Sequence, residues 1–127
     1  MRRLICAILV YVKLIGRDDK MTEKKPIIRL LFAKIKEAFY DLSDEEKMEF
    51  MLKDRKNWEE LGCKVLMMID CRWSNEEWNY VGIEEWPTIE ALEKRAKFEH
   101  EELEKYRYVE SKTYLGTCES LADYGKD

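Results

Sequence analysis

Residues Cys63–Pro87 read CKVLMMIDCRWSNEEWNYVGIEEWP, and this stretch decides the fold. Its first part holds a continuous apolar run, Val65–Ile69, which is typical of a short strand buried on both faces. Residues 74–77 are polar and of types that favour a turn. The side chains of residues 78–86 then point to opposite faces in turn, as in a strand. Pro87 cannot donate to a strand ladder and ends the second strand. The stretch therefore predicts two strands joined by a tight turn.

The second of these strands has no clearly polar face. A sheet covered by helices on one side normally leaves its other face polar. Two explanations remain: an ordinary core with some exposed aromatic side chains, or a second face covered by another subunit. Because aromatic residues are enriched at interfaces and pockets, we favour the second explanation.

Length and composition predict one globular domain. The chain has 127 residues, of which 46% are hydrophobic and 39% are charged. Its net charge of -4 argues against a nucleic-acid partner. There is one histidine, and the four cysteines are widely spaced without a CxxC pair. We therefore expect no metal site, no bound cofactor, free thiols and a cytoplasmic location.

Residues 1–20 differ from the rest because they are net basic. An apolar run, Leu4–Val12, follows two arginines and leaves three interpretations open. The segment is a dispensable extension before a start at Met21, a signal-like segment, or an added strand or helix. The run is too short to cross a bilayer as a helix, so no membrane partner is expected. We divide the chain into the extension 1–20, a domain at 26–118 and a polar tail at 119–127.

A strand and a helix are predicted before the central stretch. Pro26–Lys36 is a candidate first strand, because apolar side chains fall on both of its faces. Ser43 and Glu46 have the spacing of a capping box, which opens a helix to about Leu61. Gly62 is placed to end that helix in a left-handed conformation. The expected buried stripe of the helix consists of Met48, Met51, Leu52 and Trp58.

A helix and a strand are predicted after the central stretch. Thr88 can cap a helix that runs to about Lys105. Its expected buried stripe contains Ile89, Leu92, Ala96 and Leu103, and His100 falls within this stripe. Glutamates and lysines at i,i+4 spacing indicate a solvated outer face. Residues 106–118 are the last expected strand.

The predicted order is strand, helix, strand, strand, helix, strand. This order is the ferredoxin-like βαββαβ arrangement, an α+β fold with a four-stranded antiparallel sheet and two helices on one face. Two short sequence motifs also suggest a family, LSDEE at 42–46 and WPTIEAL at 86–92. In these motifs, residues 26–118 resemble the dimeric α/β-barrel superfamily, and within it the uncharacterised darcynin-like proteins. The resemblance implies a homodimer whose two sheets face each other, and a cavity between helices and sheet.

Five side chains are candidate ligand-binding residues, and two of these are candidate catalytic bases: His100 and Glu84. His100 has an ordinary pKa near neutrality, and Glu84 lies between aromatic side chains that could raise its pKa. A haem-degrading oxygenase of the superfamily is similar in placing a Trp and a His at the positions of Trp86 and His100. That pattern also needs an Asn on the first strand, and residues 26–36 contain none. The full candidate set is Arg29, Tyr80, Glu84, Trp86 and His100.

Two functions of different classes follow from these residues. The first is a dimeric module that assembles or binds a small apolar or aromatic molecule, without a strong catalytic signature. The alternative is a cofactor-independent monooxygenase or isomerase with an aromatic pocket, in which His100 or Glu84 is the base. For both candidate bases, an ordinary structural role is the competing interpretation: a buried histidine bonded to a neighbour, or a glutamate paired with Arg29 or Arg72.

Overall fold

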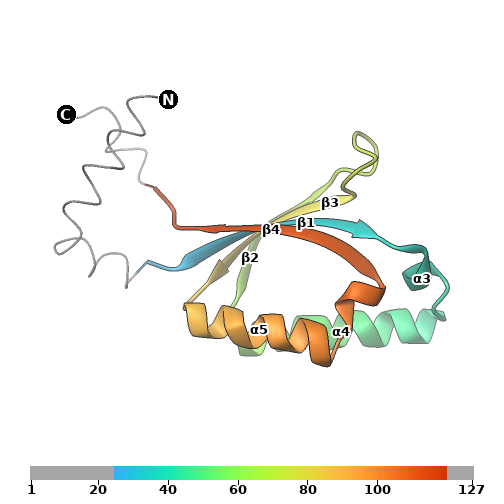
Figure 1. Cartoon of the computed structure of the whole chain (residues 1–127), viewed down its shortest axis with the longest axis horizontal. Coiled ribbons are helices and arrows are strands. Elements are labelled where there is room, and N and C mark those ends of the chain that lie inside the picture. The colour runs from blue at the N-terminus through green and yellow to red at the C-terminus, as the bar shows by residue number, and fades with distance from the viewer. Residues whose placement is uncertain (1–24, 120–127) are drawn as a thin grey trace.

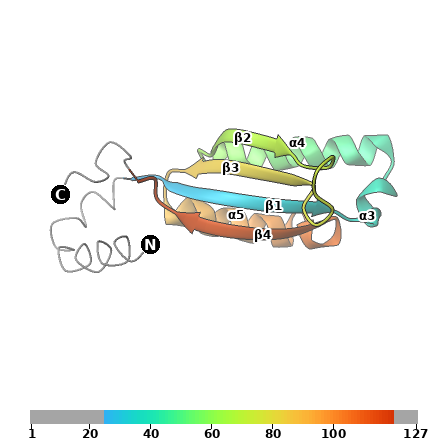
Figure 2. The same cartoon turned by 90° about the horizontal axis from the view of Figure 1, so that it is seen from above.

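The computed structural model describes residues 25–119 and contains a single sheet with helices on one face (Figure 1). The predictions for residues 1–20 and for most of the tail lie outside the described residues. The four strands are β1 (Ile27–Ile35), β2 (Lys64–Asp70), β3 (Tyr80–Trp86) and β4 (Val109–Gly116). They pair antiparallel in the order β2-β3-β1-β4, which is visible from above in Figure 2. The α+β, ferredoxin-like prediction is therefore confirmed.

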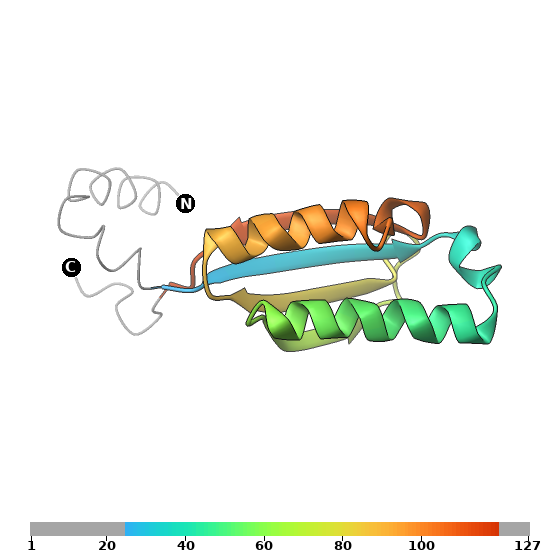
Figure 3. The same cartoon turned by 90° about the horizontal axis from the view of Figure 1, so that it is seen from below.

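Two long helices, α4 (Asp44–Glu60) and α5 (Ile89–Glu101), lie side by side against the same face of the sheet (Figure 3). We call this the helix face and the opposite side the outer face. Two short elements complete the chain, α3 (Glu37–Tyr40) in the first connection and the 3-10 turn η1 (Lys105–Arg107) before β4. The outer face is apolar over β1, β2 and β3, through Ile28, Leu30, Phe32, Met67, Ile69, Val81 and Ile83, whereas β4 contributes Tyr114 beside the charged Glu110 and Lys112.

Local chemistry sets the start of both long helices and the end of α4 where the sequence predicted them. Ser43 Oγ accepts a hydrogen bond from the backbone N–H of Glu46 at 3.1 Å, and the Glu46 carboxylate accepts from Ser43 N–H at 3.0 Å. Gly62 follows α4 with φ of +85°, a conformation that a residue without Cβ adopts at little cost. Thr88 Oγ1 accepts from Ala91 N–H at 3.1 Å and caps α5.

The apolar core lies at the end of the sheet where β2 begins and β3 ends. Trp86 is completely buried and packs with Cys63, Ala91 and Leu92. Partly buried side chains close the cluster from β1 and from the last turn of α4; they are Ile27, Trp58 and Leu61. Trp86 thus anchors both helices to the strands.

Three sequence predictions about strands and turns need correction. The connection between β2 and β3 is the nine-residue segment 71–79 rather than a tight turn, and it rises above the outer face in Figure 1. Asn79 holds it against β1, donating its N–H to Ala33 O and accepting from Ile35 N–H. In the single chain β2 is an exposed edge strand along its whole length, not a strand buried on both faces. α5 ends at Glu101, before the predicted limit of Lys105.

The predicted stripes on both helices are only partly confirmed: Trp58, Leu92 and Leu103 lie inward as predicted. On α4, however, Met48, Met51 and Leu52 are more than half exposed, and Phe50 packs against the rings of Phe39 and Tyr108. On α5 the buried side chains are Ala91, Leu92 and Arg95, whereas Ile89, Ala96 and His100 are exposed. An arginine occupies the inward position because acidic and amide groups there satisfy its charge, which a rule based on apolar residues does not anticipate.

Candidate functional site

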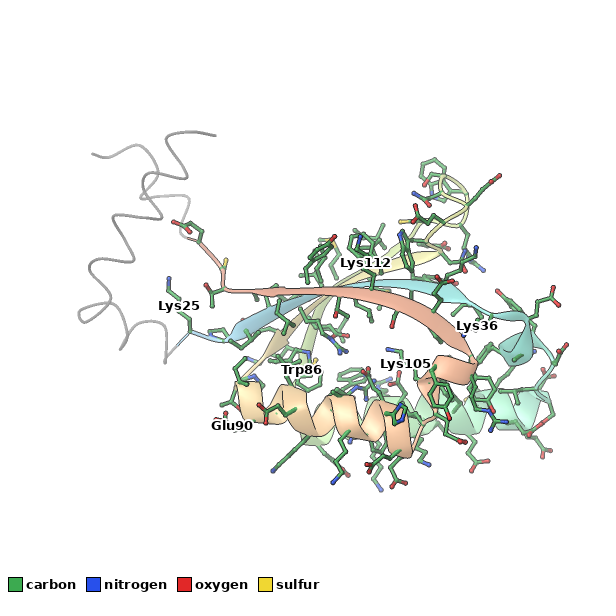
Figure 4. The ribbon with its side chains drawn as sticks, in the orientation of Figure 1. Lys25, Lys36, Trp86, Glu90, Lys105 and Lys112 are labelled. Carbon is green, nitrogen blue, oxygen red and sulfur yellow. The ribbon has the colours of Figure 1, made fainter. Side chains whose placement is uncertain are left out.

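Three of the predicted site residues meet on the helix face of the sheet. Arg29 on β1 lies directly opposite Glu84 on β3, and both are buried. Arg29 Nε donates to Glu84 Oε1 at 2.6 Å, and Trp86 Nε1 donates to the same oxygen at 2.9 Å. The Arg29 guanidinium also lies over the Trp86 ring, 5.4 Å from its centroid. Figure 4 shows Trp86 between the sheet and α5.

Charged groups of α5 extend this arrangement toward the helices. Both terminal nitrogens of Arg29 approach the Glu99 carboxylate, at 3.4 and 3.5 Å. Arg95, one turn before Glu99, donates from Nε to Glu99 Oε2 at 3.0 Å. Lys105 of η1 donates to the same oxygen at 3.0 Å. Glu99 is therefore shared by cations from β1, α5 and η1.

Arg95 connects the cluster to α4. Its guanidinium donates to the Asp54 carboxylate, to Asp54 O at 3.2 Å and to Asn57 Oδ1 at 3.0 Å. Its side chain is 3% exposed, so these bonds replace nearly all of its hydration. We call the whole set the charge cluster; it consists of Arg29, Asp54, Glu84, Arg95, Glu99 and Lys105.

The cluster strongly favours the charged form of Glu99. Burial alone would raise the pKa of this carboxyl, but Lys105, Arg29 and Arg95 hold the pKa at about 2. Burial likewise disfavours the charge on Arg29, but Glu99 and Glu84 more than offset it and raise the pKa of that guanidinium. Beside the cluster, burial and the nearby Glu84 carboxylate raise the pKa of the Cys63 thiol to about 12.

Three cations and three carboxylates balance in the charge cluster, and each has a partner there. The arrangement ties β1, β3, α4, α5 and η1 together, and losing one partner would leave an uncompensated charge in a largely buried place. The cluster is therefore better suited to holding these elements in place than to transferring protons.

A hollow of about 400 Å³ opens beside the cluster, where the end of α5, η1 and the start of β4 meet. It is lined by residues that include Glu99, His100, Lys105 and Tyr106, together with Lys36 at the end of β1. The His100 and Tyr106 rings contact each other at its wall in a tilted arrangement, with centroids 5.1 Å apart and planes inclined by 32°. Glu99 therefore belongs both to the buried cluster and to a surface that is open to solvent.

The five predicted site residues thus lie in three places. Arg29, Glu84 and Trp86 form one contact group, as their shared strand face indicated. Tyr80 lies at the far end of β3, where the Arg72 guanidinium covers its ring at 5.4 Å. His100 is exposed at the end of α5, separate from both groups.

Sequence reasoning missed four members of the charge cluster: Asp54, Arg95, Glu99 and Lys105. All four lie in helix segments whose charges resembled those of solvated faces. One signal was available, because Arg95 and Glu99 continue the phase of Ala91 and Leu92 at spacings of three and four residues. A stripe that mixes apolar residues with opposite charges can be an inward face.

Within residues 25–119, no group of three or more His, Cys, Asp or Glu side chains is arranged to hold a metal ion. In the same range no helix has both the length and the hydropathy that crossing a bilayer requires. Cys63, Cys71 and Cys118 are free thiols.

The chain matches no protein-family model and no curated protein. Solved structures do resemble it. A variant of chlorite dismutase from Candidatus Nitrospira defluvii superposes with a TM-score of 0.61 at 14% identity, covering 87% of this chain and 48% of that one. A protein of unknown function from Rhodopseudomonas palustris gives a TM-score of 0.53 at 18% identity, covering 76% of this chain and 85% of that one.

These identities are low, so the likeness shows the fold alone. It is the α+β, ferredoxin-like fold with its four-stranded antiparallel sheet. The chain spans about half the length of the chlorite dismutase chains that it matches.

Proposed function

We propose that this protein is an assembly module that forms a homodimer through the outer face of its sheet. One observation carries the proposal: the outer face is apolar over β1, β2 and β3 and at Tyr114 of β4, while both long helices pack on the opposite face. Met67 and Tyr114 on this face are 54% and 52% exposed in the single chain. An apolar surface of this extent is typical of an interaction site.

The rings on this face form a connected group that suits the centre of an interface. Phe32 contacts Trp78 and Tyr114, each at a centroid separation of 6.0 Å. Aromatic residues supply much of the binding energy at the centres of interfaces. The group lies over β1, which has neighbours on both sides in the sheet.

Charges of both signs border the apolar area, which favours a second copy over an unrelated partner. Lys64 and Glu85 lie opposite each other at one side, with 3.9 Å between Nζ and Oε2. Glu110 and Lys112 lie on β4 at the other side; Figure 4 shows Lys112 on the face away from the helices. A surface with both signs can be complementary to itself across a two-fold axis. The dimer expected from the sequence resemblance agrees with this proposal.

Sedimentation velocity at micromolar concentration tests the proposal. We expect the unmodified chain to sediment as a dimer and Leu30→Lys to sediment as a folded monomer, because the variant places a charge at the centre of the outer face. Met48→Lys is the matched control, since Met48 is an exposed apolar residue on α4. A monomeric unmodified chain, or a dimer lost only in Met48→Lys, would refute the assembly through this face.

The enzymatic alternative is a monooxygenase or isomerase with one catalytic base. Between the two candidate bases, the geometry favours His100. Glu84 is 6% exposed, and its Oε1 already accepts from Arg29 and Trp86, whereas His100 lines the hollow and reaches solvent. If an activity is found, His100→Gln should abolish it without changing the oligomeric state. Retained activity in this variant would remove His100 as the base.

A further inference from the structure

We propose that the hollow beside the charge cluster binds a small planar carboxylic acid, such as an aromatic acid, with its carboxylate toward Lys105 and Lys36. The proposal concerns a different surface from the outer face and goes beyond assembly. The volume of about 400 Å³ is within the range of small-molecule sites.

The ammonium of Lys105 provides the first binding group. Its side chain is 14% exposed and makes one hydrogen bond, to Glu99 at 3.0 Å. An ammonium has three N–H donors, so two remain available. Glu99 does not depend on Lys105 alone, because Arg29 and Arg95 also hold its carboxylate. Lys105 can therefore bind a second anion without leaving Glu99 unpaired.

Lys36 provides a second ammonium from another element. Its Nζ donates to Tyr106 O at 2.6 Å, which fixes the side chain across η1 and leaves two donors. Figure 4 shows Lys36 and Lys105 on either side of the turn that leads into β4. Ser111, at the same hollow, adds a hydroxyl group. A carboxylate with two oxygens can accept from donors on both sides.

The rings of His100 and Tyr106 provide the surface for the planar part of the ligand. The two rings pack against each other at a tilt of 32°, and the outward side of either ring can take a third ring in an offset or edge-to-face arrangement. The site therefore offers donors for one carboxylate beside a surface for one planar ring.

The single histidine of the chain makes a direct test feasible, because the proton NMR spectrum contains one set of imidazole C–H signals. The probe is benzoate, compared with benzamide, which lacks the charge, and with acetate, which lacks the ring. We expect benzoate to shift the His100 signals in a saturable manner, and benzamide and acetate to bind about tenfold more weakly. Equal binding of benzamide would refute the role of the lysines, and equal binding of acetate would refute the role of the rings.

Two variants test the lysines separately. Lys36→Met and Lys105→Met should each weaken benzoate binding by about tenfold, since each removes a charged hydrogen bond. If Lys105→Met disrupts the charge cluster, Lys36→Met still tests the proposal, because Lys36 lies outside that cluster. Lys97→Met is the control, because Lys97 lies exposed on α5 outside the hollow. Unchanged benzoate binding in Lys36→Met, or no saturable shift in the unmodified protein, would overturn the proposal.

Discussion

Replacing Glu99 by Gln should destabilise the protein strongly and in a pH-dependent manner. The change keeps the shape of the side chain but removes the carboxylate shared by Arg29, Arg95 and Lys105. Three cations then face two carboxylates in a largely buried place. Removing one partner from a buried ion pair is costly because an uncompensated charge remains.

The size of the effect follows from the pKa of Glu99. The pKa falls from an ordinary value of 4.5 to about 2 in the folded protein. At about 1.4 kcal/mol per pKa unit, the favoured charge contributes about 3 kcal/mol to the free energy of unfolding. The side chain is 16% exposed, so screening by solvent reduces this figure only modestly.

The sign of the pH dependence is fixed by the lowered pKa. Above the unfolded-state value the stabilisation is fully present, and it is lost as the pH falls from about 4.5 toward about 2. Urea denaturation followed by tryptophan fluorescence should therefore show a large difference between the unmodified protein and Glu99→Gln at pH 7. The difference should become much smaller at pH 3.

Glu101→Gln is the matched control, because Glu101 is exposed on the same helix and has no ion pair within the described residues. It should change the free energy of unfolding by less than about 0.5 kcal/mol at either pH. The reasoning is refuted if Glu99→Gln costs no more than this control at pH 7, or if its cost is the same at both pH values.

Three further predictions concern other positions. Ser43→Ala should lower the free energy of unfolding by about 1 kcal/mol in urea titrations, because it removes the capping box of α4; an unchanged midpoint would contradict this. Gly62→Ala should cost about 1 kcal/mol or more in the same assay, since φ is +85° and the new Cβ would lie 3.2 Å from Pro87 Cγ. Cys63 should resist iodoacetamide in the folded protein while exposed Cys118 is alkylated, as peptide mass spectrometry can show. Equal rates at the two thiols without denaturant would count against a buried Cys63.

The fold was predictable because its local signals act over a few residues. The capping box at Ser43, the glycine at position 62 and the cap at Thr88 depend only on neighbouring chemistry, and all three occur as predicted. The alternation along β3 likewise placed Glu84 and Trp86 on one face. These features need no knowledge of tertiary contacts.

The candidate site was only partly predictable because its charges are paired over long sequence separations. Arg95 is tolerated inside the protein through Asp54 and Asn57, which lie about forty residues earlier. A search for apolar residues alone assigns such an arginine to the solvent-exposed side of the helix and places the predicted buried stripe too far around it. For this reason His100 was wrongly expected to face the sheet and to lie near Glu84.

The central position of β1 determines when the sheet can be completed during synthesis. Ile28, near the start of β1, pairs with Gly116, so the two are separated by 88 positions along the chain. Until β4 emerges, β1 has a bare edge rich in Ile and Leu beside β3. Such a nascent chain is expected to fold slowly and to depend on chaperones, since unpaired strand edges promote aggregation. A stop codon between residues 87 and 108 would leave a product in this state permanently.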